Sequence, residues 1–213
     1  MKTIKGGLYL VIDPKPGIHE VGPRVEAAIR GGVDVVQIWN HWHPGQNRWE
    51  FVETICILAR QARVPVLVNE ATHLLYTTSA DGIHFDQLPP SPEKVRQKAG
   101  RPVLMGITCG NDLKRVQWAV DHQFDYISFC AMFPSPSVDA CDMVSFDTVQ
   151  QARACTDMPV FASGGVTPEN LGKLMELGVN GVAVISGILK ADDPEKAARK
   201  YKKVIMEKLR TNQ

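Results

Sequence analysis

Short apolar runs alternate with longer amphipathic segments along the whole chain. The runs are rich in β-branched residues and are bounded by glycine, proline or polar residues, which is typical of buried parallel strands. We expect strands over residues 7–13, 33–39, 65–70, 82–86, 103–109, 125–131, 159–164 and 181–186. Between them, apolar residues recur at helical spacing, for example over residues 21–31 and 47–62.

Eight strands, each followed by a helix, predict an α/β fold of the (β/α)8 TIM barrel type. A doubly wound open sheet is the rival, but it usually carries a glycine fingerprint after its first strand, and this chain has none there. Ser91 and Asn111 are the expected N-caps of the helices after strands four and five, and the run Asp192-Asp-Pro-Glu195 is expected to open the final helix. No linker divides the chain, so residues 1–213 are expected to form one domain.

Charge and hydropathy then narrow the classes of partner. Lys and Arg number 24 against 23 Asp and Glu, a formal net charge of +1, which gives no case for nucleic acid or a membrane surface. The first apolar run is too short for a signal peptide, and no run approaches the roughly 20 residues of a membrane helix. A cytoplasmic location is therefore expected, and the oligomeric state stays open, a homo-oligomer included.

Cysteine spacing argues against a structural metal or a disulfide framework. The five cysteines form no C-x-x-C pair, and their number is odd. Cys109 and Cys130 stand at the ends of expected strands, so they are candidates for lining a pocket, although packing as small apolar side chains is the ordinary role.

The last two expected strands end in glycine-bearing turns. In a barrel of this type, such turns form a phosphate cup, because glycine lets backbone N–H groups approach an anion closely. We therefore expect a phosphorylated ligand to be bound at Gly164, Gly165, Ile185, Ser186 and Gly187.

Several motifs, in order and spacing, carry a resemblance to a known family. They are Tyr9-Leu-Val-Ile-Asp13, Ala80-Asp-Gly-Ile-His84 with Gln87, Phe133-Pro-Ser-Pro-Ser137, Gly164-Gly-Val-Thr-Pro-Glu-Asn170 and Gly181-Val-Ala-Val-Ile-Ser186. Together they make the chain similar to the thiamine phosphate synthase family, which includes a sister branch of thiazole tautomerases. The resemblance covers nearly the whole length and marks the chain as a divergent member.

The resemblance implies a transferase of thiamine biosynthesis. In this family a hydroxymethylpyrimidine diphosphate ionises, and the nitrogen of a thiazole phosphate captures the pyrimidine cation. Mg²⁺ and basic side chains stabilise the departing diphosphate. By resemblance, the thiazole phosphate binds at the glycine cup and at Ser135 and Ser137, the pyrimidine at Gln37, and the diphosphate near Asn69.

The chain departs from the family pattern around the diphosphate. The family's Q-L-R-x-K is Gln37-Ile-Trp-Asn-His41 here, so both cations are replaced, and the loop lysine falls on Val138. Glu70 stands in place of one metal carboxylate and Pro89 in place of the other, which leaves Glu70 and the displaced Asp86 as the candidate Mg²⁺ ligands. The thiazole phosphate half is thus retained, whereas synthase activity is expected to be weak or changed.

Two alternatives stay open beside the synthase. A thiazole phosphate tautomerase would use the same cup without a diphosphate, but glycine (Gly110) occupies the place of that branch's histidine. A non-catalytic binder of a small phosphorylated heterocycle is the other. For an enzyme, His41 and Cys109 are the candidate proton-transfer residues, both expected at the barrel mouth, and Trp39 is the residue that would stack on a planar ring or anchor a loop.

Overall fold

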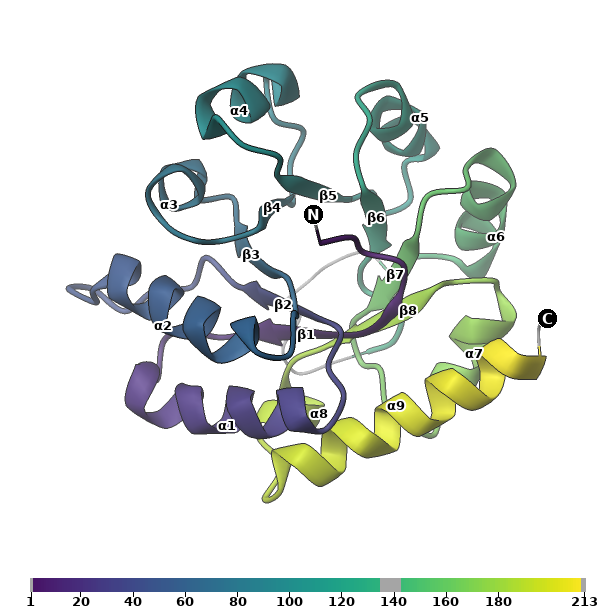
Figure 1. The fold of residues 1–213 in the computed structure, drawn as a ribbon. Helices are drawn as coiled ribbons and strands as arrows, with labels where there is room; N and C mark the ends of the chain where they lie inside the picture. The colour runs from purple at the N-terminus through teal and green to yellow at the C-terminus, as the bar shows by residue number, and fades with distance from the viewer. Residues whose placement is uncertain (1, 135–142, 212–213) are drawn as a thin grey trace.

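The computed structural model describes residues 2–134 and 143–211, and it confirms the closed eight-stranded barrel. Every neighbouring pair is parallel, and the last strand pairs with the first (Figure 1). The strands are β1 Gly7–Ile12, β2 Val35–Ile38, β3 Val66–Asn69, β4 Gly82–Phe85, β5 Leu104–Thr108, β6 Tyr126–Phe129, β7 Val160–Ser163 and β8 Gly181–Val184.

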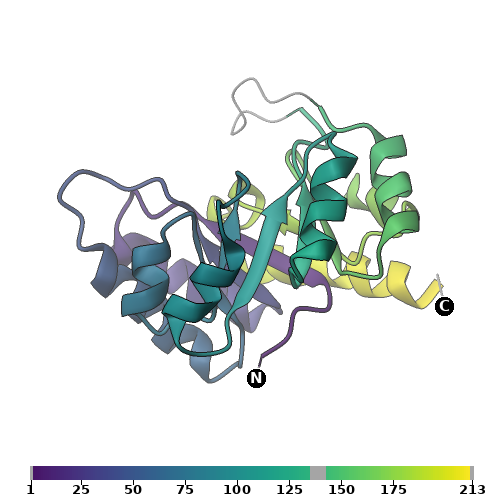
Figure 2. The ribbon, with the colours of Figure 1, turned by 90° about the horizontal axis from the view of Figure 1, so that it is seen from above.

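Helices surround the barrel as an outer ring, and the long last helix runs along one side of it (Figures 1 and 2). None of the helices in the described ranges has an apolar stretch long enough to cross a membrane. Their bounds are α1 Ile18–Arg30, α2 Arg48–Arg60, α3 Thr72–Thr77, α4 Pro92–Ala99, α5 Leu113–Asp121, α6 Phe146–Cys155, α7 Leu171–Glu176, α8 Ser186–Leu189 and α9 Pro194–Thr211.

Strand alternation divides the core into two parts. Side chains that point out of the barrel pack against the helices and form the larger cluster, with members such as Leu10, Ile38 and Ile107. Side chains that point inward form a smaller cluster, which includes Tyr9, Tyr126 and Phe161. The ring centroids of these three lie 5.2–5.8 Å apart, at tilted or edge-on angles, so aromatic rings fill the interior. This packed layer is the floor beneath the carboxyl ends of the strands.

Two expectations about helix ends need correction. Helix α1 begins at Ile18 rather than near residue 21, and it includes Pro23, because its apolar face buries Val21 and Val25 around that position. The N-cap of α5 is Asp112, whose carboxylate accepts from the Lys114 N–H at 2.9 Å. Asn111, the expected cap, instead donates to Met143 O and accepts from Ser145 N–H, and so connects this turn to the start of α6.

Candidate ligand site at the carboxyl end of the barrel

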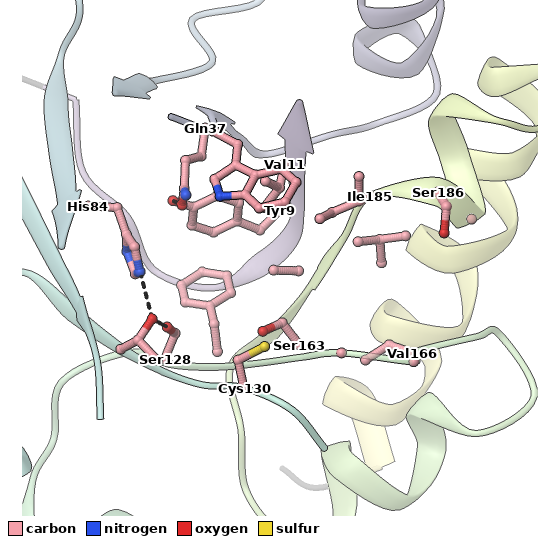
Figure 3. Close-up of a pocket in the computed structure, with 18 of the residues that line it drawn as sticks. Tyr9, Val11, Gln37, His84, Ser128, Cys130, Ser163, Val166, Ile185 and Ser186 are labelled. Atoms are coloured by element: carbon pink, nitrogen blue, oxygen red, sulfur yellow. Dashed lines mark hydrogen bonds between the residues drawn. The ribbon is translucent and has the colours of Figure 1, made fainter. Parts of the chain in front are cut away.

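A cavity of about 460 Å³ opens where the carboxyl ends of the strands meet. That volume is within the range of small-molecule sites. Figure 3 shows side chains from strands far apart in sequence converging on it. Its lining consists of Tyr9, Val11, Gln37, Trp39, His84, Asp86, Thr108, Ser128, Cys130, Phe161, Ser163, Gly164, Gly165, Val166, Ala183, Val184, Ile185, Ser186 and Gly187.

One wall of the cavity is the glycine cup expected from the sequence. Gly164 and Gly165 both have positive φ, 86° and 64°, a conformation that other residues rarely adopt. A Cβ on Gly165 would lie 2.6 Å from Pro134 O, so the chain also approaches too closely there for a side chain. Ser186 and Gly187 lie in the first turn of α8, where backbone N–H groups have no acceptor within the same helix. The structure therefore brings all five predicted cup residues to one cavity.

A chain of hydrogen bonds crosses the floor. Tyr9 Oη lies 2.7 Å from Gln37 Oε1 and 2.8 Å from Tyr126 Oη, and Tyr126 Oη lies 2.8 Å from His84 Nδ1. Because an amide oxygen only accepts, Tyr9 donates to Gln37, Tyr126 donates to Tyr9, and His84 donates from Nδ1. His84 Nε2 is then the acceptor for the Thr108 hydroxyl, 2.9 Å away. Because the Gln37 oxygen accepts from Tyr9, the Gln37 amide nitrogen remains available as a donor.

Burial keeps His84 neutral in this chain. Loss of solvation lowers the pKa of the imidazole to about 4, and the nearby Asp86 carboxylate opposes that change only in part. Burial likewise raises the pKa of the Tyr9 and Tyr126 hydroxyls above their ordinary value. The floor is therefore a neutral, satisfied polar network rather than an ionised one.

Asp86 and Asn69 lie beside this network. The Asn69 amide donates to Asp86 Oδ2 at 2.9 Å, and its oxygen accepts from the Asn40 N–H at 3.2 Å. Glu70 is differently placed, because its Oε1 accepts from the backbone N–H groups of Asp86 and Gln87, at 2.5 and 3.0 Å. Glu70 therefore holds the loop after β4 in place and does not line the cavity.

The positions of Glu70 and Asp86 show which of these two candidate ligands could contact Mg²⁺ in the cavity. The ion takes oxygen ligands in strict octahedral geometry, often from one or two carboxylates and substrate phosphates. One Glu70 oxygen, Oε1, accepts from two N–H donors and Glu70 does not line the cavity, so Asp86 is the carboxylate that faces it. Within residues 2–134 and 143–211, no three His, Cys, Asp or Glu side chains gather in a way that could hold a metal. Asp86 is therefore the carboxylate of the described lining that could hold Mg²⁺ together with substrate phosphates.

His41 and Trp39 lie together at the rim. The two rings are 4.7 Å apart, and Trp39 lines the cavity. His41 Nδ1 lies 3.1 Å from Asp13 Oδ1, a partner from the end of β1 that the sequence did not reveal. Both side chains of this pair are part-exposed, 43% for His41 and 34% for Asp13. The pair is thus a solvent-accessible histidine–carboxylate dyad next to the ligand cavity.

Cys109 does not face the barrel mouth, contrary to expectation. It belongs to the outer core cluster and is 1% exposed, and burial raises the pKa of its thiol to about 12. The alternation along β5 explains this, because Leu104, Gly106 and Thr108 point inward and Cys109 follows the opposite face. Cys130, at the end of β6, is the cysteine that lines the cavity (Figure 3).

The sequence predicted some of the other residues of the site but not all of them. Gln37, Trp39 and Asp86 line the cavity, and Asn69 contacts Asp86, whereas Ser135 and Ser137 lie outside the described residues. Sequence reasoning gave no site role to Tyr9, Tyr126 or Ser128. The inward positions of each strand, every second residue, were the signal that would have found them.

Comparison with known proteins agrees with the motifs. Residues 8–188 match the family model described as thiamine monophosphate synthase. The chain is 35% identical to the thiamine-phosphate synthase of Natronomonas pharaonis over 203 residues, which cover 91% of this chain and 92% of that one. It is 31% identical to that of Halorhodospira halophila over 193 residues, 91% of each chain.

Among solved structures, the barrel is similar to the thiamine phosphate pyrophosphorylase from Pyrococcus furiosus. The TM-score is 0.83 at 24% identity, and the alignment covers 96% of this chain and 98% of that one. At this identity the likeness supports the fold, whereas the family rests on the sequence matches. The chain therefore belongs to the thiamine-phosphate synthase family.

Proposed function

We propose that this protein binds a thiazole phosphate, or a similar five-membered-ring phosphate monoester, with the phosphate in the glycine cup. The observation that supports this is that Gly164 and Gly165, both at positive φ, line the cavity beside the first turn of α8. Neither glycine N–H donates a hydrogen bond to a residue in the described part of the chain. Such N–H groups bind an anion well and need no basic side chain.

The charges around the cavity favour a monophosphate over a diphosphate. Asp86 is the charged residue of the described lining, which contains no Lys or Arg. Residues 135–142, beyond the described part, contain no Lys or Arg either. A diphosphate bound there would lose solvation without compensating cations. This supports a protein that keeps the thiazole phosphate half of the family's reaction, with synthase turnover weak or absent.

His41 remains the proposed proton-transfer residue, with Asp13 as the group that orients its ring. A carboxylate on Nδ1 fixes the tautomer and leaves Nε2 to accept or deliver a proton. Cys109 is no longer proposed, because its thiol is enclosed in the outer core.

The cup is tested best at Ser186. We expect Ser186→Asp to weaken binding of thiazole phosphate roughly 100-fold in calorimetry, because a carboxylate enters the anion site without backbone strain. Ser186→Ala is the matched control and should change the affinity less than about threefold, since the backbone N–H remains. Gly165→Asp should also abolish binding, but its positive φ and close contacts disturb the turn itself. Equal affinity in wild type and Ser186→Asp would remove the proposal.

A further inference from the structure

Gln37 is buried in the cavity wall, and one end of its amide has a partner in the described part of the chain. Its Oε1 accepts from the Tyr9 hydroxyl at 2.7 Å (Figure 3). Its Nε2 donates to no residue that the structure describes. No enclosed side-chain nitrogen or oxygen of the described residues lacks a partner, so this nitrogen is open to the cavity that Gln37 lines. A ligand beside Gln37 therefore meets an N–H donor.

Behind Gln37, three buried side chains continue the hydrogen bonds across the floor. The Tyr9 and Tyr126 hydroxyl oxygens are 2.8 Å apart, and Tyr126 Oη is 2.8 Å from His84 Nδ1. Tyr126 is 0% exposed, so water cannot replace a partner that it loses. A hydroxyl has one proton, so each tyrosine that has two partners donates to one and accepts from the other. The hydrogen bonds therefore run in one direction from end to end.

Two directions satisfy every member of this chain of hydrogen bonds. In the first, His84 holds its proton on Nδ1 and the Gln37 oxygen accepts at the far end. In the second, the Gln37 nitrogen would donate to Tyr9, and His84 would hold its proton on Nε2. Thr108 fits either, because its hydroxyl lies 2.9 Å from Nε2 and 3.1 Å from Ser128 Oγ. Reversal of the Gln37 amide thus requires the His84 proton to change nitrogen.

We propose that Tyr9, Tyr126 and His84 are positioning residues for the amide beyond them. Their hydrogen bonds fix Gln37 so that its NH₂ group, and not its oxygen, faces the cavity. This wall then selects a ligand atom that accepts a hydrogen bond, whereas the reversed amide would select a donor. The role goes beyond the proposed function, because no residue of the glycine cup belongs to this chain of hydrogen bonds.

The position of the His84 proton is the measurement that tests this direction. A protonated and a bare ring nitrogen have well-separated ¹⁵N chemical shifts, and burial keeps the ring neutral at neutral pH. We expect wild type, without ligand, to show a protonated Nδ1 and a bare Nε2. A proton on Nε2 in wild type would overturn the proposal, and this result needs no variant that folds.

Tyr9→Phe tests whether the direction is transmitted. It leaves His84 as the one described partner of the Tyr126 hydroxyl. A buried hydroxyl that does not donate is costly, so Tyr126 should donate to Nδ1. The His84 proton should then occupy Nε2 in roughly tenfold excess or more. A proton that stays on Nδ1 in Tyr9→Phe would contradict the proposal.

Tyr201→Phe is the matched control. It removes the hydroxyl of another buried tyrosine, which donates to Val166 O and has no contact with His84. The proton of His84 should remain on Nδ1. Movement of the proton in this variant as well would overturn the proposal, because the tautomer would then respond to packing in general.

Neutron diffraction from wild-type crystals tests the other end. We expect two deuterons on the Gln37 amide atom that faces the cavity, and one deuteron on Tyr9 Oη directed at the other amide atom. An amide oxygen facing the cavity would overturn the proposal. None of these measurements uses thiazole phosphate, so failure of that ligand to bind would count against the proposed function alone.

Discussion

The His84 ring has hydrogen-bond partners on two other strands. Its Nδ1 reaches Tyr126 on β6, its Nε2 reaches Thr108 on β5, and Tyr126 continues the chain to Tyr9 on β1. Because the ring is enclosed, its proton uptake is linked to folding. The protonation behaviour of His84 therefore depends on its surroundings more than on its residue type.

This linkage predicts a stability change between pH 7 and pH 5. The pKa of His84 is about 4 in the folded chain against an ordinary 6.5, so below pH 6.5 the unfolded chain takes up a proton that the folded chain does not. Stability that is present above pH 6.5 is lost as the pH falls toward 4. We expect wild type to lose about 2 kcal/mol more than His84→Gln between pH 7 and pH 5, measured by urea unfolding. Parallel losses in both proteins would contradict this.

At the scale of elements, packing in the barrel interior depends on a small residue, Gly106, next to a large one, Tyr126. Gly106 on β5 faces inward, and a Cβ there would lie 2.0 Å from the Tyr126 ring on β6. The paired register of β5 and β6 places the two residues next to each other. The glycine thus makes room for the tyrosine that connects His84 to Tyr9.

A pair of glycine substitutions tests this packing. Gly106→Ala should lower the free energy of unfolding by about 1–3 kcal/mol, because the added methyl group overfills the interior. Gly22→Ala, in helix α1, meets no atom closer than 3.6 Å and should raise it by about 0.5–1 kcal/mol. Denaturant unfolding measures both, and a stabilised Gly106→Ala protein would show that the interior has space that we do not recognise.

At the scale of the whole molecule, closure of the barrel decides which charges meet. It gathers eight strand ends around one cavity, whose described lining has one carboxylate and no Lys or Arg. The family's reaction needs positive charge where the diphosphate departs. The fold is thus that of the family, and the described lining supplies no Lys or Arg side chain for this step.

We therefore expect thiamine phosphate formation to be slow with Mg²⁺, the pyrimidine diphosphate and thiazole phosphate. Loss of two charge-assisted contacts, at roughly 1.5–3 kcal/mol each, corresponds to a rate about 10²–10⁴-fold below that of a related synthase. The double variant Trp39→Arg, His41→Lys restores the family's basic residues and should raise the rate. A coupled assay in which wild type turns over like its relatives would refute this prediction.

The sequence by itself determined the class of fold and located the glycine turns that we propose as a phosphate cup. Both depend on local signals, because strand and helix periodicity and glycine turns are properties of neighbouring residues. Which side chains meet was decided by the tertiary structure. Cys109 points away from the cavity, Glu70 is bound by two N–H groups, and His41 gains Asp13 as a partner. These contacts join loops distant in sequence, and only the register of the closed barrel fixes them.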